Sequence, residues 1–230
     1  MDKTEKFNGY HAVTLFSGGQ DSTTCLYWAK KHFNKVSAIG FFYGQNHSVE
    51  LEQAQKICDR EGITLKIVDI AEIMKLSKSA LTEKGGNVNE VRDDGLPASY
   101  VPNRNQIFLT LAHSYAQLIE ADSLVTGVCQ TDFSGYPDCR QVFINKLEEA
   151  LEYGSNKNIS IWTPLMFINK AETFKLAKDL GVLDIIVNDT MTCYNGDTTP
   201  HYWGMGCSEC PSCKLRQKGF DNFLEIEKEC

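Results

Sequence analysis

The feature that most constrains the fold is a short glycine-rich stretch between an apolar run and a helical pattern. Residues 11–16 form the apolar run, residues 17–22 read Ser-Gly-Gly-Gln-Asp-Ser, and a helix-compatible pattern extends from residue 21 to about residue 31. A strand, a glycine turn and a helix start in this order can direct several backbone N–H groups at one point, as phosphate-binding loops do. The stretch therefore predicts a nucleotide-binding unit.

Apolar, β-branched runs alternate with helical patterns through most of the chain. Further strands are expected at residues 36–43, 64–70, 123–128 and 159–164, and helices at residues 48–60, 105–120, 141–153 and 169–180. Such alternation predicts an α/β fold, a doubly wound and mostly parallel sheet with helices on both faces. Because ligands of these sheets bind beyond the carboxyl ends of the strands, we expect the Ser17 loop, the Tyr43 segment and the stretch after Gly127 to meet in one crevice.

The alternation is interrupted twice. Residues 82–101 are rich in Gly, Asn, Asp and Pro and predict a long loop, a kind of loop that is usually functional or disordered. From about residue 192 the chain becomes rich in Cys and Gly, before a last helical pattern at residues 215–229. We therefore expect an α/β domain at residues 1–191, and a metal-binding segment with a C-terminal helix at residues 192–230. In that helix the apolar positions, which suit either the core or a homodimer interface, are Phe220, Phe223, Leu224 and Ile226.

Composition and charge disfavour several classes of protein. The chain has 230 residues, 42% of them hydrophobic, enough for one large domain with a small appendage. A net charge of −7 argues against a chain that coats nucleic acid. The chain contains no run of about 18 apolar residues, so we expect no membrane span. The polar residues 1–6 do not resemble a signal segment. We expect a cytoplasmic protein without nucleic-acid or membrane partners.

The glycine stretch differs from two common nucleotide-binding loops. It has neither the lysine of Gly-x-x-x-x-Gly-Lys-Ser/Thr nor the spacing of Gly-x-Gly-x-x-Gly. Instead, the hydroxyls of Ser17 and Ser22 and two glycines surround Asp21. Hydroxyls and backbone N–H groups can hold a leaving pyrophosphate, and Asp21 can hold the Mg²⁺ that neutralises it. Ser-Gly-Gly alone is an ordinary turn, but the whole stretch between a strand and a helix favours release of pyrophosphate.

The cysteines indicate a metal site rather than a disulfide framework. There are nine, an odd number, and three of them, Cys207, Cys210 and Cys213, lie within seven residues. A tetrahedral Zn²⁺ site needs four ligands and favours thiolates when it is structural. Cys193 is the nearest upstream candidate for the fourth ligand, and His201 is its rival. A redox or iron–sulfur role is the alternative to zinc.

The stretch at residues 126–140 is dense in polar and aromatic groups at the place where the sheet is expected to bind its substrate. Asp132 and Asp138 can accept hydrogen bonds from the N–H edge of a guanine-like base, and Phe133 or Tyr136 can cover a ring face. The simpler alternative is a tight turn that carries surface acids.

The glycine stretch resembles the loop of the PP-loop, or N-type, ATP pyrophosphatases, which split ATP into AMP and pyrophosphate and leave AMP on a carbonyl oxygen. In this family a Lys-x-Glu at a helix start often assists, and residues 169–172 read Asn-Lys-Ala-Glu. Lys170 is thus a candidate, with a solvated helix lysine as the alternative. Arg104 can pair with a carboxylate or phosphate in a fork geometry, unless it is an ordinary surface arginine.

Four motifs narrow the resemblance to the QueC family, the 7-cyano-7-deazaguanine synthases of queuosine precursor biosynthesis. They are residues 16–24, Tyr43-Gly44-Gln45 with His47, residues 126–140, and residues 192–196 leading to the cysteines at 207–213. The resemblance implies one structural Zn²⁺ on Cys193, Cys207, Cys210 and Cys213. It implies ATP with Mg²⁺ along Phe16, Ser17, Gly18, Gly19, Gln20, Asp21, Ser22, Thr23, Thr24, Cys25 and Leu26.

The resemblance also implies the reaction. The expected enzyme is an ATP-dependent ligase that converts 7-carboxy-7-deazaguanine and ammonia to 7-cyano-7-deazaguanine through an acyl adenylate and an amide. The expected catalytic residues are Ser17, Asp21, Ser22, Lys170 and Arg104. The expected substrate-binding residues are Tyr43, His47, Arg104, Asp132, Phe133 and Asp138. The alternatives are a PP-loop tRNA-thiolating enzyme and a non-catalytic nucleotide-binding zinc adaptor.

Three departures from the family pattern bear on the site. Asn46 stands where the family usually has arginine, and Asn103 stands where it usually has glycine. Asparagine tolerates positive φ, so the second exchange is mild. The interval from Cys193 to Cys207 is longer than in the family and contains residues 198–203. This longer interval leaves the fourth metal ligand open.

Overall fold

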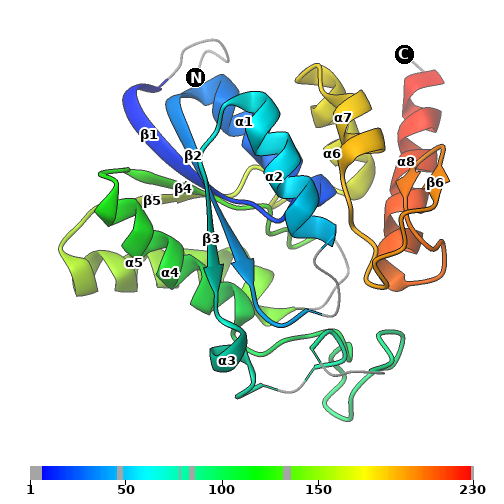
Figure 1. The fold of residues 1–230 in the computed structure, drawn as a ribbon, viewed down its shortest axis with the longest axis horizontal. Helices are drawn as coiled ribbons and strands as arrows, with labels where there is room; N and C mark the ends of the chain where they lie inside the picture. The colour runs from blue at the N-terminus through cyan, green and yellow to red at the C-terminus, as the bar shows by residue number, and fades with distance from the viewer. Residues whose placement is uncertain (1–6, 46–48, 78, 83–85, 132–135, 229–230) are drawn as a thin grey trace.

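The computed structural model describes residues 7–45, 49–77, 79–82, 86–131 and 136–228. Its centre is a five-stranded parallel sheet in the order β3-β2-β1-β4-β5 (Figure 1). The strands are β1 (Phe7–Leu15), β2 (Phe33–Phe42), β3 (Leu65–Asp69), β4 (Ser123–Val125) and β5 (Ser160–Trp162). The strand order reverses at β1, which lies between β2 and β4. This is the doubly wound topology that the sequence predicts.

Helices cover both faces of the sheet, with α1, α2 and α6 on one side and α4 and α5 on the other (Figure 1). Neighbouring residues of β1 show why: Ala12 packs with Cys25 of α1, whereas Val13 packs with Leu109 of α4, since successive strand residues point to opposite faces. The long helices are α1 (Gln20–His32), α2 (Val49–Glu61), α4 (Arg104–Leu118), α5 (Gln141–Ser155) and α6 (Lys170–Asp179).

The loop between β3 and α4 is packed against the body of the protein. It begins with the short helix α3 (Ala71–Met74) and otherwise contains turns and one bridge, from Val91 to Pro97, among its described residues. Leu81, Val88 and Val101 are buried in the main hydrophobic core. The loop that the sequence predicts is therefore present, and apolar side chains hold it over the carboxyl end of the sheet.

The C-terminal third contains elements that the sequence does not predict. Helix α7 (Leu183–Asp189) and the hairpin of β6 (Pro200–His201) and β7 (Gly204–Met205) are too short for a periodic signal. A short 3-10 helix, η1 (Pro137–Cys139), precedes α5. The last helix, α8 (Pro211–Lys228), begins four residues earlier than expected, and proline suits the first turn of a helix because it needs no N–H partner there.

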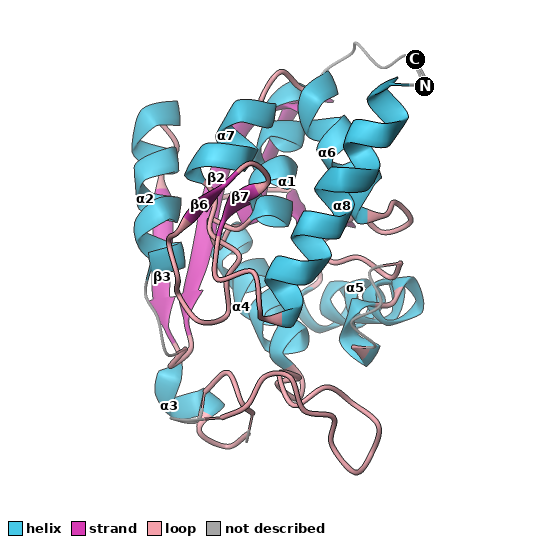
Figure 2. Ribbon diagram, turned by 90° about the vertical axis from the view of Figure 1, so that its right-hand side faces the viewer, coloured by secondary structure: helices cyan, strands magenta, loops and turns pink. Residues whose placement is uncertain are grey.

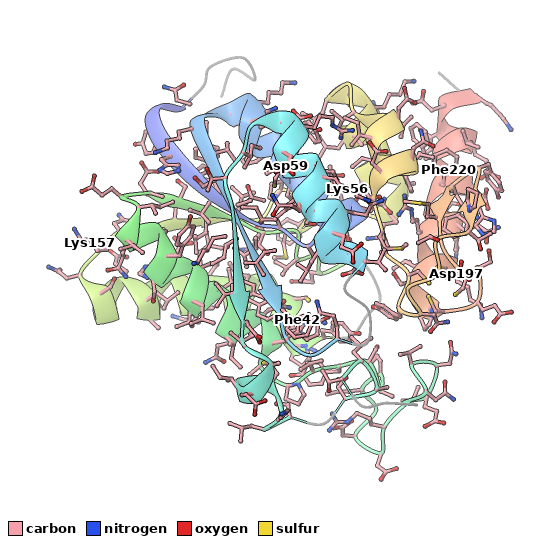
Figure 3. The ribbon with its side chains drawn as sticks, in the orientation of Figure 1. Phe42, Lys56, Asp59, Lys157, Asp197 and Phe220 are labelled. Atoms are coloured by element: carbon pink, nitrogen blue, oxygen red, sulfur yellow. The ribbon has the colours of Figure 1, made fainter. Side chains whose placement is uncertain are left out.

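Helix α8 lies beside α6 in both ribbon views (Figure 2). Phe220 and Phe223 of α8 pack on Phe174 of α6, with ring centroids 4.9 and 6.1 Å apart (Phe220 is labelled in Figure 3). These two side chains therefore belong to the core, whereas Leu224 remains 38% exposed. No helix among the described residues has the length and apolar character needed to cross a membrane.

Candidate active site

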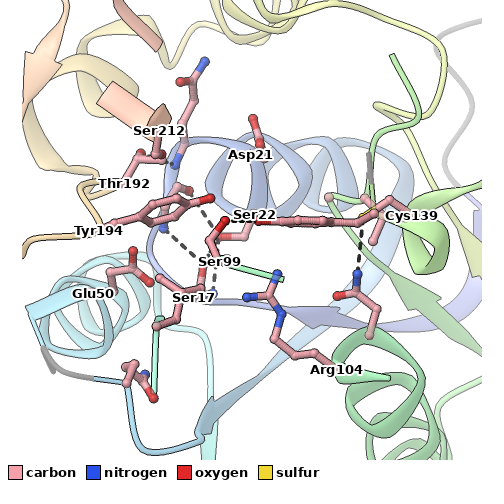
Figure 4. Close-up of a pocket in the computed structure, with 18 of the residues that line it drawn as sticks. Ser17, Asp21, Ser22, Glu50, Ser99, Arg104, Cys139, Thr192, Tyr194 and Ser212 are labelled. Atoms are coloured by element: carbon pink, nitrogen blue, oxygen red, sulfur yellow. Dashed lines mark hydrogen bonds between the residues drawn. The ribbon is translucent and has the colours of Figure 1, made fainter. Parts of the chain in front are cut away.

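A cavity of about 620 Å³ lies at the carboxyl ends of the central strands (Figure 4). It is lined by the stretch after β1, the end of β2, the start of α4 and the stretch after β4. Lys170 of α6 and residues 192 and 194 close another side. The volume suits a small-molecule site. The three stretches that the sequence places at strand ends thus do meet in one crevice.

The glycine stretch is shaped by close backbone packing. Gly18 has a φ of +81°, and a Cβ built there would lie 2.4 Å from the carbonyl oxygen of Glu50 and 2.7 Å from the amide nitrogen of Ala54. Only glycine fits such a position. The turn brings the hydroxyls of Ser17 and Ser22 to 3.2 Å from each other, and the Ser22 hydroxyl donates to the Gly19 carbonyl at 3.1 Å. Both hydroxyls thereby reach the cavity beside the start of α1.

Lys170 is bound to Asp21 rather than solvated. Its Nζ atom lies 2.9 and 2.7 Å from the two carboxylate oxygens of Asp21, and its side chain is only 10% exposed. Asn169 and Glu172 form a capping box that fixes Lys170 at the first position of α6. The structure thus brings together two residues that lie 149 positions apart in the sequence and that both line the cavity.

Arg104 begins α4 and enters the cavity among aromatic rings. Its guanidinium carbon lies 5.9 Å from the ring centroid of Tyr43 and 6.0 Å from that of Tyr136, within the range of cation–π attraction. Asn103, the residue before it, has a φ of 60°, so asparagine here adopts the left-handed conformation that suits glycine. Burial raises the pKa of the Tyr43 hydroxyl, which keeps that group neutral.

Several expected site residues lie elsewhere among the described residues. Asp138 is buried away from the cavity, and its Oδ2 atom accepts a hydrogen bond at 3.0 Å from the backbone N–H of Asn105, in the first turn of α4. The cavity is lined by Phe16, Ser17, Gly19, Gln20, Asp21 and Ser22, whereas the expected nucleotide-binding residues that do not line it are Gly18, Thr23, Thr24, Cys25 and Leu26. The expected residues His47, Asp132 and Phe133 lie outside the described residues, as does Asn46.

The cavity also contains residues to which sequence reasoning assigned no role. Glu50, Thr192, Tyr194 and Arg216 all contribute to its wall. Thr192 and Tyr194 belong to the motif at residues 192–196 and flank Cys193, so the sequence could have identified them as site residues. Nothing in the sequence distinguishes Glu50 from the other acids at the start of α2, or Arg216 from a surface arginine.

Arg216 connects the C-terminal helix to the wall of the cavity. It is fully buried, and its guanidinium donates to the carbonyl oxygens of Ile186, Thr190 and Trp203 and to the Thr192 hydroxyl, at 2.6 to 3.2 Å. Burial lowers its pKa to about 10, so it remains charged at neutral pH.

Four thiols form a candidate metal centre at the base of α8. The sulfur atoms of Cys193, Cys207, Cys210 and Cys213 all lie within 4.8 Å of one another. Tetrahedral Zn–S bonds of about 2.3 Å require sulfur atoms about 3.8 Å apart, and those of Cys207 and Cys213 are 4.0 Å apart. Backbone N–H groups of Cys210 and Cys213 donate to the Cys207 and Cys210 sulfurs, as suits thiolates. The donor set fits a closed metal site.

The hairpin explains the long interval between the first two of these cysteines. Strands β6 and β7 occupy it and return the chain to Cys207, so Cys193 joins the group despite the spacing. His201 lies outside the cluster: its Nε2 atom is 2.8 Å from the Gly206 carbonyl oxygen, and its ring stacks on Trp203. The fourth member of the cluster is therefore Cys193, and His201 is not part of it.

The parallel sheet, the glycine turn before α1 and the cavity at the reversal of strand order together define an α/β nucleotide-binding protein. A family model narrows the class: the chain belongs to the QueC family, described as queuosine biosynthesis protein QueC, whose model matches residues 11–224. This confirms the family resemblance of the four motifs.

Individual relatives are similar over nearly their whole length. The chain is 52% identical over 215 residues to a 7-cyano-7-deazaguanine synthase of Helicobacter pylori strain HPAG1, covering 92% of this chain and 94% of the relative. It is 48% identical over 223 residues to one of Phocaeicola vulgatus, covering 96% and 98%. Among solved structures, a 4-thiouridine synthetase–RNA complex with bound ATP is similar in fold, with a TM-score of 0.50 and 16% identity over 97% of this chain and 54% of that one.

Proposed function

We propose that this chain is an ATP-dependent ligase that converts 7-carboxy-7-deazaguanine and ammonia to 7-cyano-7-deazaguanine. The observation that carries the proposal is the family match over residues 11–224, with relatives of this name that are about half identical along nearly the whole chain. The cavity at the carboxyl end of the sheet, beside a glycine turn, is consistent with it.

The chemistry requires activation of a poor electrophile twice. A carboxylate oxygen attacks the α-phosphorus of ATP, pyrophosphate leaves, and the resulting acyl adenylate has AMP as a good leaving group. Ammonia attacks the acyl carbon and expels AMP, which gives the amide. The amide oxygen then attacks the α-phosphorus of a second ATP and expels pyrophosphate. Loss of AMP and protons from the adenylated amide leaves the nitrile.

In this scheme the glycine stretch holds the β- and γ-phosphates. The hydroxyls of Ser17 and Ser22, 3.2 Å apart, and the N–H groups at the start of α1 face the leaving pyrophosphate. Asp21 would hold Mg²⁺, which would neutralise the charge of the pyrophosphate. Lys170, paired with Asp21 in this structure, would add positive charge beside the developing anion.

The acid substrate lies on the aromatic side of the cavity. Arg104 pairs with its carboxylate in a fork geometry, and Tyr43 contacts the ring system. His47, Asp132 and Phe133 complete the substrate site in the proposal. Asp138 contributes indirectly, since its hydrogen bond to Asn105 helps to fix the first turn of the helix that carries Arg104.

The metal in the proposal is one structural Zn²⁺ on the four cysteines. Zinc bound there would fasten α8 and the hairpin to the body of the protein and so support the wall that Arg216 and Tyr194 provide. The division into an α/β domain at residues 1–191 and a zinc segment at residues 192–230 stays a prediction, as do a homodimer and a cytoplasmic location.

Incubation of the purified chain with the deazapurine acid, an ammonium salt and Mg·ATP tests the function, with products identified by mass spectrometry. The expected result is the nitrile, together with AMP and pyrophosphate. AMP formation without amide or nitrile would contradict the proposal, and transfer of sulfur to tRNA would replace it with the thiolating alternative.

A further inference from the structure

Most charged side chains of the cavity have partners within the protein. Asp21 pairs with Lys170, and Arg216 donates to backbone carbonyls. Glu90 on the rim accepts a hydrogen bond from the Asn87 amide at 3.0 Å. Among the described residues that line the cavity, Glu50 and Arg104 carry opposite charges and form no ion pair.

Glu50 is a half-buried residue that lines the cavity. It lies in the first turn of α2, its backbone carbonyl packs against Gly18, and its side chain borders both the main cavity and a smaller one of about 30 Å³ beside Tyr194. Burial raises the pKa of its carboxyl group to about 7, although the positive charge of Arg104 opposes the shift. No described residue donates a hydrogen bond to this carboxylate.

A carboxylate that is partly removed from water and has no donor loses some of its solvation, and such groups in clefts are frequently functional. Arg104 lines the same cavity from a different helix (Figure 4), and the two groups form no ion pair among the described residues. A ligand that presents N–H donors at one end and an anion at the other satisfies both groups at once. The rings of Tyr43 and Tyr194 line the same cavity and offer flat apolar surfaces to such a ligand.

We propose that Glu50 is a specificity-determining residue that accepts hydrogen bonds from the ring N–H and the exocyclic amino group of the deazapurine, while Arg104 holds its carboxylate. This inference rests on the proposed function and identifies the side chain that recognises the pyrimidine edge of the substrate. The substrate has this bipolar form: two adjacent N–H donors on the pyrimidine edge and a carboxylate on the five-membered ring. A carboxylate accepts two parallel hydrogen bonds from such an edge.

The test compares 7-carboxy-7-deazaguanine with its analogue that lacks the exocyclic amino group. A site built to bind that group rejects the analogue strongly, because one carboxylate oxygen stays unpaired. We expect the parent chain to prefer the full substrate by about 100-fold in kcat/KM. In Glu50→Gln the preference shrinks to below about tenfold, mainly through KM for the acid, and KM for ATP changes by less than about twofold.

Two further variants keep the test decisive. Glu52→Gln, on an exposed residue of the same helix, is the matched control and keeps the full preference. Glu50→Asp keeps the charge but draws it back by one methylene, so it retains the preference with a raised KM even if Glu50→Gln folds poorly.

A Glu50→Gln enzyme with the full preference would overturn the inference, as would a parent chain with no preference. A change confined to KM for ATP would also overturn it, because the carboxylate would then contact the nucleotide. If the parent chain converts neither acid, the proposed function itself fails.

Discussion

The glycine stretch at residues 17–22 and the cysteine cluster at residues 193–213 are both small-ligand cradles, but they are built differently. The first is contiguous: one strand, one turn and one helix start bring Ser17, Asp21 and Ser22 to the cavity. The second takes one thiol from Cys193 and three from residues 207–213, where the chain enters α8, with a hairpin between them. The first cradle is shaped by backbone packing, and the second gathers four thiols that fit a metal site.

Because of this difference, we expect the two regions to contribute differently to activity and to stability. Backbone contacts hold the glycine stretch with or without a ligand, so its side chains are free to serve the reaction. Four clustered thiols contribute most of their stabilisation only when a cation binds them. Changes at the first region should therefore act mainly on turnover, and changes at the second mainly on folding.

The largest expected effect is that of Asp21→Ala on turnover. Loss of the proposed Mg²⁺ ligand, together with its ion pair to Lys170, should lower the rate of pyrophosphate release by about 10³-fold. The midpoint of thermal unfolding should change little, because Asp21 is 30% exposed. Asp184→Ala, at an exposed residue of α7, is the control. Pyrophosphate release at the parent rate by the Asp21 variant would remove this residue from the mechanism.

Cys210→Ser should act mainly on metal content and stability rather than on turnover. With three thiols left, the bound zinc per chain should fall towards zero, and loss of about 3 kcal/mol of stability should lower Tm by about 6–12 °C. Zinc content by mass spectrometry and Tm by calorimetry measure the two effects. His201→Ala, which changes the rival ligand, should keep its zinc. Equal zinc loss in both variants would place the imidazole in the metal site after all.

Gly18→Ala tests whether close packing shapes the glycine stretch. Its φ of +81° and the approach of Glu50 and Ala54 should together cost about 3 kcal/mol of unfolding free energy. Gly62→Ala is the matched comparison, since Gly62 has a φ of +65° with nothing within 4 Å of its Cβ position. It should cost about 1 kcal/mol. Urea unfolding measures both, and equal costs would mean that the packing contributes nothing.

The smallest expected effect concerns Asn103, the residue before Arg104. Because asparagine already adopts a φ of 60° there, Asn103→Gly should change the unfolding free energy by less than about 0.5 kcal/mol, whereas Asn103→Val should cost about 1–2 kcal/mol. Urea unfolding again measures both variants. A valine variant as stable as the parent would show that the left-handed turn before α4 is dispensable.

The sequence predicts what local patterns determine. Strand and helix periodicity gives the parallel sheet, the glycine stretch gives the loop after β1, and the Cys spacing gives three of the four thiols. Long-range packing decides the rest. The Lys170–Asp21 pair joins α6 to α1, the hairpin returns Cys207 to Cys193, and Asp138 caps α4 instead of lining the cavity. Glu50 gives no sequence signal because only the packing of α2 against Gly18 brings it to the cavity.

The central proposal is that the enzyme activates the same substrate carbon twice, with one ATP each time. Its most direct test is a time course of AMP, amide and nitrile from a limiting amount of 7-carboxy-7-deazaguanine. We expect two AMP for each nitrile, with the amide rising and then falling. An amide that accumulates as the final product with one AMP each, or a nitrile formed with a single AMP, would contradict it.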